Sequence, residues 1–280
     1  MVEGGAADGV EYPNAVMRSH KITFTIALTG ISRMLLARDW LLGWTPQPVE
    51  VGATAVAVIE RHWIASGANR LDAVWVRPAA APVRAVVLIC HGIGETVEHW
   101  TGVQELLAAN GAASLVFNYS GYGRSTGRIE AAQCELDTIA AFEFVEGLAP
   151  GVPVAMLGFS LGSGIAAAVM GRVRASRLVL CAGFTSFRAA AHSLGVPVGL
   201  GPLVPRLWHA EESLRGCSAP ILVVHGERDR VFPVKMGAEL AACCGAEERI
   251  VPKLTHAEPY YRPQVEYWGP IISWIEGGRV

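Results

Sequence analysis

The chain has 280 residues, of which 51% are hydrophobic and only 17% are charged. This composition excludes a disordered chain, which needs low hydrophobicity and a high net charge. With 23 basic and 25 acidic residues, the formal net charge is −2, so we expect no basic surface for binding nucleic acid. We therefore expect a globular protein with a sizeable core.

Residues 1–49 are expected to form an N-terminal extension. The segment Ile22–Trp44 is apolar, but Arg33, Arg38 and Asp39 interrupt it. No run of about 18 uninterrupted apolar residues occurs, so no transmembrane helix is predicted. We predict an amphipathic helix that packs on the domain. Weak contact with a membrane surface and an export signal are the alternatives.

Eight short apolar runs rich in β-branched residues predict strands at 54–63, 71–76, 85–90, 114–118, 152–158, 178–181, 221–225 and 249–254. Helical periodicity is found at 96–110, 131–147, 161–173, 234–244 and 264–276. The first two strands are close enough to form a hairpin. The later alternation of strands and helices predicts a largely parallel sheet of about eight strands in one α/β domain over 50–280. Only 187–218 breaks this alternation, and it predicts a short irregular or helical lid.

The six cysteines form no C-x-x-C pair, so a zinc site or a thioredoxin-like motif is not predicted. A chain of this length does not need a disulfide framework to fold. We therefore expect buried, reduced thiols in a cytoplasmic protein. The sequence leaves the oligomeric state open.

The sequence Gly158-Phe159-Ser160-Leu161-Gly162 has the pattern G-x-S-x-G. An apolar run enters it and a helix of small residues leaves it, which is the strand–turn–helix context of a nucleophile elbow. Glycines are expected at both ends because a Cβ there would collide with a neighbouring strand or helix. Ser160 at a helix N-terminus predicts a nucleophile, since the free N–H groups there favour negative charge.

A serine nucleophile needs a base, and the base needs a third group to orient it. Chains with this turn carry these groups in the order Ser, Asp or Glu, His. Asp229 is the only aspartate after Ser160, and His256 is the only histidine after Asp229. Both follow predicted strands, so we predict Asp229 as the acid and His256 as the base. Glu227 is the alternative acid, and His225 is expected to be structural.

Ester hydrolysis passes through an oxyanion that backbone N–H groups can stabilise. One donor is expected to be the N–H of Leu161, the residue after the nucleophile. The second is expected from the loop His91-Gly92-Ile93-Gly94-Glu95, where we favour Ile93 over Gly94. His91 is expected to have a structural role.

These motifs resemble those of the α/β-hydrolase superfamily over roughly residues 50–278. The sequence Asn118-Tyr119-Ser120-Gly121-Tyr122-Gly123-Arg124-Ser125 is similar to the glycine-rich loop of that family. It is expected to brace the sheet beside the site, with Tyr122 in the pocket as an alternative. The short insertion and Val231-Phe232-Pro233 resemble the small-lid serine hydrolases, which include esterases and thioesterase-like enzymes.

The prediction is therefore a serine hydrolase that cleaves carboxylic esters through Ser160, His256 and Asp229, with no metal or organic cofactor. The apolar insertion favours a small-molecule ester with an apolar acyl or alcohol group. A thioesterase or acyltransferase would use the same three residues. A peptidase, or a non-catalytic ligand-binding protein with a hydrolase fold, would be the remaining alternatives.

Overall fold

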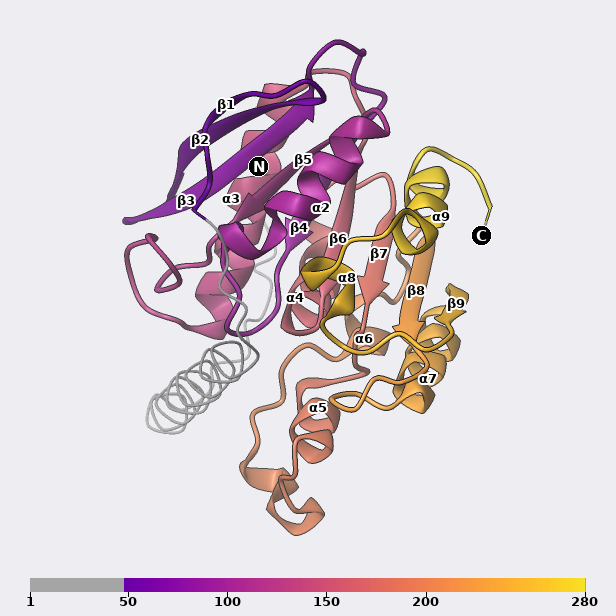
Figure 1. Cartoon of the computed structure of the whole chain (residues 1–280). Helices are drawn as coiled ribbons and strands as arrows, with labels where there is room; N and C mark the ends of the chain where they lie inside the picture. The colour runs from indigo at the N-terminus through magenta and orange to yellow at the C-terminus, as the bar shows by residue number, and fades with distance from the viewer. Residues whose placement is uncertain (1–47, 280) are drawn as a thin grey trace, which may run out of the picture.

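The structure, a computed structural model, describes residues 48–279 (Figure 1). The predicted helix within Ile22–Trp44 lies outside the described residues and stays a prediction. Among the helices of residues 48–279, none is both long and apolar enough to cross a bilayer.

A single sheet contains the strands β1 (Gly52–Ala53), β2 (Ala57–Ser66), β3 (Asn69–Pro78), β4 (Ala85–Cys90), β5 (Ala112–Phe117), β6 (Val154–Phe159), β7 (Leu178–Cys181), β8 (Ile221–Gly226) and β9 (Glu247–Val251). Their order is β1-β2-β3-β5-β4-β6-β7-β8-β9. The first four strands in that order pair antiparallel, including the predicted β2–β3 hairpin, and the others pair parallel. The predicted mostly parallel sheet of about eight strands is confirmed. The ninth strand, β1, is only two residues long and leaves no apolar pattern in the sequence.

The helices are α2 (Val97–Ala109), α3 (Ala131–Leu148), α4 (Leu161–Val169), α5 (Phe187–Ser193), α6 (Ala210–Ser213), α7 (Val234–Cys244), α8 (Glu258–Tyr261) and α9 (Val265–Ile275), with the 3₁₀ segments η1 (Met170–Arg172) and η2 (Val198–Leu203). The helices α2, α8 and α9 cover one face of the sheet, and α3, α4 and α7 cover the other (Figure 1). The sheet is thus the middle layer of three.

Strand β4 shows why the central strands are apolar throughout. All six of its residues are buried. Its even-numbered side chains join the core beneath α3 and α4, and its odd-numbered side chains join the core beneath α2 and α9. A strand covered on both faces needs apolar residues at consecutive positions, and this removes the alternation typical of half-exposed strands.

The parallel strands β4 to β9 bring their carboxyl ends to one edge of the sheet. Ser160 follows β6, Asp229 follows β8, and His256 follows β9. The loop after β4 joins the same edge, because β4 pairs with β6. The insertion 187–218 contains α5, η2 and α6 but no strand, as the sequence predicts. Ligand sites of open α/β sheets lie at this edge.

Candidate active site

Ser160 occupies a sharp turn between β6 and α4. Its backbone has φ 51° and ψ −115°, which L-residues rarely adopt. Such a conformation costs on the order of 1–3 kcal/mol and persists only where its surroundings hold it. Here the Ser160 N–H donates to Cys181 O at 3.0 Å, and Ser163 Oγ donates to Ser160 O at 2.6 Å. The serine is only 4% exposed.

The glycines on either side of Ser160 are required by close backbone contacts. A Cβ on Gly158 would lie 2.5 Å from Gly162 O and 2.6 Å from Ser163 Cα, at the start of α4. A Cβ on Gly162 would overlap the carbonyl oxygen of Cys90, at the end of β4. Helix α4 therefore begins in direct contact with β4 and β6, as the glycine spacing of the sequence predicts.

The three residues predicted to act together lie in one hydrogen-bonded row. His256 Nε2 is 3.0 Å from Ser160 Oγ, and His256 Nδ1 is 2.7 Å from Asp229 Oδ2. The carboxyl oxygen only accepts when ionised, so Nδ1 carries the proton and Nε2 faces the serine hydroxyl as an acceptor. Residues that are 96 and 27 positions apart along the chain thus meet in space.

The Asp229 carboxylate is fully enclosed. Its Oδ1 accepts hydrogen bonds of 2.8 Å from the N–H groups of Val231 and Phe232. Burial alone would raise the pKa of Asp229, but the hydrogen bond and charge of His256 and the Phe232 N–H outweigh it, so the pKa is lowered. The carboxylate is therefore ionised at neutral pH and suited to orienting a histidine.

His225 supports the loop that carries Asp229 and Phe232. Its Nε2 donates to Phe232 O at 2.8 Å and lies 3.5 Å from Asp229 Oδ2. Burial lowers the pKa of His225, so the ring is neutral at pH 7. The alternative acid, Glu227, instead accepts a hydrogen bond from Lys253 N at 2.9 Å. His256 therefore contacts Asp229, and His225 has the structural position that the sequence predicts.

Aromatic rings enclose His256. Phe159 lies on one side, with ring centroids 5.3 Å apart, and Phe232 lies 5.4 Å away. Tyr260 of α8 packs edge-on against Phe159 at 5.3 Å. These apolar neighbours limit the positions that the imidazole can occupy and lower the local dielectric, which strengthens its hydrogen bonds.

The predicted oxyanion donors come from two elements that meet at Ser160. Leu161 is the first residue of α4, where backbone N–H groups have no intrahelical acceptor. Ile93 and Gly94 are the central residues of a turn that Glu95 N closes onto Gly92 O at 3.4 Å. Gly94 has φ 78°, which a turn of type II requires at its third residue.

The loop after β4 lies directly against the serine. A Cβ on Gly92 would be 3.2 Å from Ser160 Cβ and 2.5 Å from Glu95 Oε1. Glu95 is buried, and its Oε2 accepts hydrogen bonds of 2.9 Å from Gly92 N and from Trp100 Nε1. This carboxylate ties the loop to α2. The sequence analysis did not single out Glu95 or Trp100.

His91 and the glycine-rich loop after β5 form a second layer behind the site. His91 Nδ1 donates to Gly92 O at 2.8 Å, and the His91 ring contacts the rings of Tyr119 and Tyr122. Tyr122 is only 5% exposed. Burial lowers the pKa of His91 to about 4, so the ring is neutral at pH 7. These contacts agree with the expected bracing role of the loop.

The sequence analysis also missed helix α8, which follows His256. Thr255 N and Thr255 Oγ1 both donate to Glu258 Oε2 at 2.7 Å. Glu258 is the first residue of α8, so its side chain turns back onto the segment that precedes the helix. The contact fixes the turn that carries His256.

Comparison with known proteins agrees with this fold. A family model described as the alpha/beta hydrolase fold matches residues 85–196. The crystal structure of an alpha-beta hydrolase from Vibrio vulnificus superposes with a TM-score of 0.65 and 19% identity, over 97% of this chain and 98% of that chain. The chain therefore has the α/β-hydrolase fold.

Two further proteins are similar to this chain. Over 189 residues the chain is 26% identical to the lysophosphatidylserine lipase ABHD12 of Macaca fascicularis. That match covers 60% of this chain but 48% of the lipase, so the chain spans about half of the lipase's length. Est1E of Butyrivibrio proteoclasticus, solved with ferulic acid bound, has a TM-score of 0.61 and 20% identity, over 77% of this chain and 96% of that chain.

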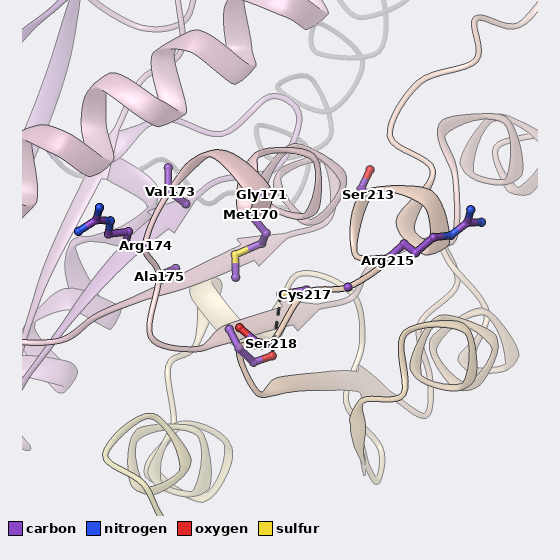
Figure 2. Close-up of a pocket in the computed structure, with 11 residues that line it drawn as sticks. Met170, Gly171, Val173, Arg174, Ala175, Ser213, Arg215, Cys217 and Ser218 are labelled. Atoms are coloured by element: carbon purple, nitrogen blue, oxygen red, sulfur yellow. Dashed lines mark hydrogen bonds between the residues drawn. The ribbon is translucent and has the colours of Figure 1, made fainter.

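A cavity of about 440 Å³ lies away from Ser160. Residues before β7 and before β8 line it, with Met170 at its wall, so it opens at the amino ends of these strands. Figure 2 shows that its two arginines, Arg174 and Arg215, point away from each other.

In the part of the chain that the structure describes, no group of three or more His, Cys, Asp or Glu side chains is placed to hold a metal ion.

The contact between Gly162 and Cys90 predicts that one methyl group added at Gly162 greatly destabilises the fold. Gly162→Ala should lower the free energy of unfolding by about 3 kcal/mol or more, because the new Cβ overlaps backbone that cannot move aside. Gly171→Ala is the control, since a Cβ there meets nothing within 4 Å. Urea unfolding of both variants tests this. Equal stabilities would contradict the close contact.

The burial of His91 predicts acid sensitivity. The unfolded chain, where the pKa of His91 has its ordinary value of 6.5, takes up a proton before the folded chain, where it is about 4. The free energy of unfolding should therefore fall between pH 6.5 and pH 4, by about 3 kcal/mol from this group. Urea unfolding at several pH values should show a shallower fall for His91→Asn. An unchanged pH dependence would contradict the prediction.

Proposed function

We propose that the chain is a serine hydrolase that cleaves carboxylic esters. The observation that carries the proposal is the continuous hydrogen-bonded row from Ser160 through His256 to Asp229. The strained backbone of Ser160 adds support, because strain held by its surroundings is typical of functional sites. The lipase and Est1E are relatives whose names agree with ester chemistry.

In the proposed reaction, His256 Nε2 takes the proton of Ser160 as its Oγ attacks the acyl carbon. The ionised Asp229 holds His256 in the required tautomer and stabilises the imidazolium that forms. The N–H groups of Leu161 and Ile93 are the proposed donors to the oxyanion. His256 then protonates the leaving alcohol, and a water molecule activated by the same histidine releases the acid from the acyl-enzyme.

We also propose that one side of the substrate is apolar. The rings of Phe159 and Phe232 flank His256, and Phe232 contacts Phe184 at 5.5 Å, toward the lid. Apolar side chains beside the proposed base favour an alkyl or aryl group over a sugar or a peptide, because they offer few polar partners. A cytoplasmic location and the absence of a cofactor requirement stay predictions.

The first test is the loss of the proposed nucleophile. Ser160→Ala should lower kcat for p-nitrophenyl acetate by roughly 10⁴-fold or more, because no other group can form the acyl-enzyme. A fluorophosphonate probe should label the wild-type chain at Ser160 and leave the variant unlabelled. Ser218→Ala is the control, since Ser218 is exposed and lines the cavity that lies away from Ser160.

Activity retained by Ser160→Ala would refute the serine hydrolase. A wild-type chain that the probe fails to label would instead favour a non-catalytic binding protein. Acyl transfer to an added alcohol, in excess over hydrolysis, would identify an acyltransferase.

A second test concerns the substrate. Oxygen esters and thioesters with matched acyl chains of increasing length should separate the remaining candidates. We expect kcat/KM to rise by roughly tenfold or more from short to medium chains, because each buried CH₂ contributes about 0.8 kcal/mol. A flat profile would refute selection for an apolar chain, and a preference for the thioester beyond its greater chemical reactivity would indicate a thioesterase.

A further inference from the structure

The tip of the lid exposes an unusual number of large apolar side chains. Leu194, Val198, Leu200 and Leu203 are 47%, 80%, 48% and 67% exposed, and all four lie within ten residues. The surrounding segment, 189–205, contains no Asp, Glu, Lys or Arg. Apolar residues scattered singly on a surface need no explanation, but a contiguous group indicates a binding surface.

The lid tip is a hairpin that hydrogen bonds hold in place. Helix α5 ends in a turn at Gly195, with φ 95°, and η2 returns the chain. His192 Nδ1 donates to Val196 O at 2.8 Å, and Ser193 Oγ donates to Val231 O at 2.7 Å, which ties the lid to the loop of Asp229. In Figure 1 the α5–η2 hairpin projects away from the sheet. These contacts hold the apolar side chains outward.

The base of the lid contains two arginines, Arg188 and Arg206. A second cavity, of about 240 Å³, is lined by Ser186, Arg188, Arg206, Leu207 and His209. Arg188 Nε and His209 Nδ1 are buried atoms with no hydrogen-bond partner in the described residues. Arg206 pairs with Glu212 at 2.8 Å. A buried N–H on a guanidinium without an acceptor is costly, so this cavity is suited to an anionic oxygen ligand.

The base of the lid also packs close to the candidate site. A Cβ on Gly164 of α4 would lie 3.0 Å from Trp208 Cβ and 2.7 Å from the ring of Phe184. Phe184 contacts Phe232, which contacts His256. Consecutive ring contacts therefore link the base of the lid to His256.

We propose that the lid is a docking surface for a phospholipid bilayer. The exposed tip, formed by Leu194, Val198, Leu200 and Leu203, inserts into the acyl boundary, and the cavity of Arg188 and His209 receives a lipid phosphate. An apolar tip beside cations is the combination that binds peripheral proteins to lipid surfaces. The unpartnered Arg188 Nε lies beside a tip without charged residues, and a phospholipid carries its phosphate next to its acyl chains, so the bilayer is the favoured occupant.

The test measures binding of the full chain to vesicles by flotation, without turnover, so that it is independent of the proposed esterase activity. Vesicles contain phosphatidylcholine alone or with 30% phosphatidylglycerol, the latter fraction being roughly that needed for a marked surface potential. The double variant Val198→Asp, Leu203→Asp should lower the partition coefficient at least about tenfold. Leu136→Asp is the matched control, because Leu136 is 48% exposed on α3.

The cationic cavity is tested separately. Arg188→Gln should remove most of the added binding that phosphatidylglycerol gives, while binding to phosphatidylcholine alone persists. Arg215→Gln, at an exposed arginine outside this cavity, should bind as the wild-type chain does. The wild-type chain and its variants share residues 1–47. Any contribution of those residues to vesicle binding is therefore the same in all, and differences in binding report on the lid.

Three results would overturn the proposal. One is equal vesicle binding by the wild-type chain and the double variant. Another is a lower Tm of the double variant in the absence of vesicles, which would show that another segment of the chain covers the tip. The third is a wild-type dimer, seen by sedimentation, that the double variant converts to monomer, since the occupant would then be a second copy of the chain.

Discussion

The candidate site depends on the close contact between α4 and the strands around it. Gly162 lies against the end of β4, and this contact fixes where α4 begins. Because the helix begins there, Ser160 must turn through a backbone conformation that L-residues avoid. The same contact brings the loop after β4 beside Ser160, so nucleophile and candidate oxyanion donors are positioned by one packing constraint.

The residues around His256 show how a charged site is built in an apolar protein. Asp229 is the acceptor of three short hydrogen bonds, one of them from His256, and its neighbours His225 and Phe232 are neutral. The field of this carboxylate acts on the imidazole of His256 across a hydrogen bond of 2.7 Å. A low local dielectric makes such a pairing stronger than it would be at a surface. The low charged fraction of the chain is consistent with this design.

Much of the fold and the site was predictable from the sequence, for identifiable reasons. Buried parallel strands such as β4 need continuous apolar runs, and the elbow needs glycines at fixed spacing, so both leave local patterns. Glu95 and Trp100 left none, since their hydrogen bond joins a loop to α2 through a contact that exists only in the folded chain. Helix α8 has only 4 residues, which is too short to show helical periodicity in the sequence.

The position of β9 has a consequence for how activity would be lost. This strand is the last in the sheet, pairs only with β8 and is largely exposed, and the loop that follows it carries His256. Edge strands open at lower free-energy cost than central ones, often without unfolding of the whole domain. Warming would therefore separate the histidine from the serine while β4, β6 and the rest of the core remain folded. For the proposed hydrolase, thermal inactivation would then precede melting, and it would be reversible on cooling.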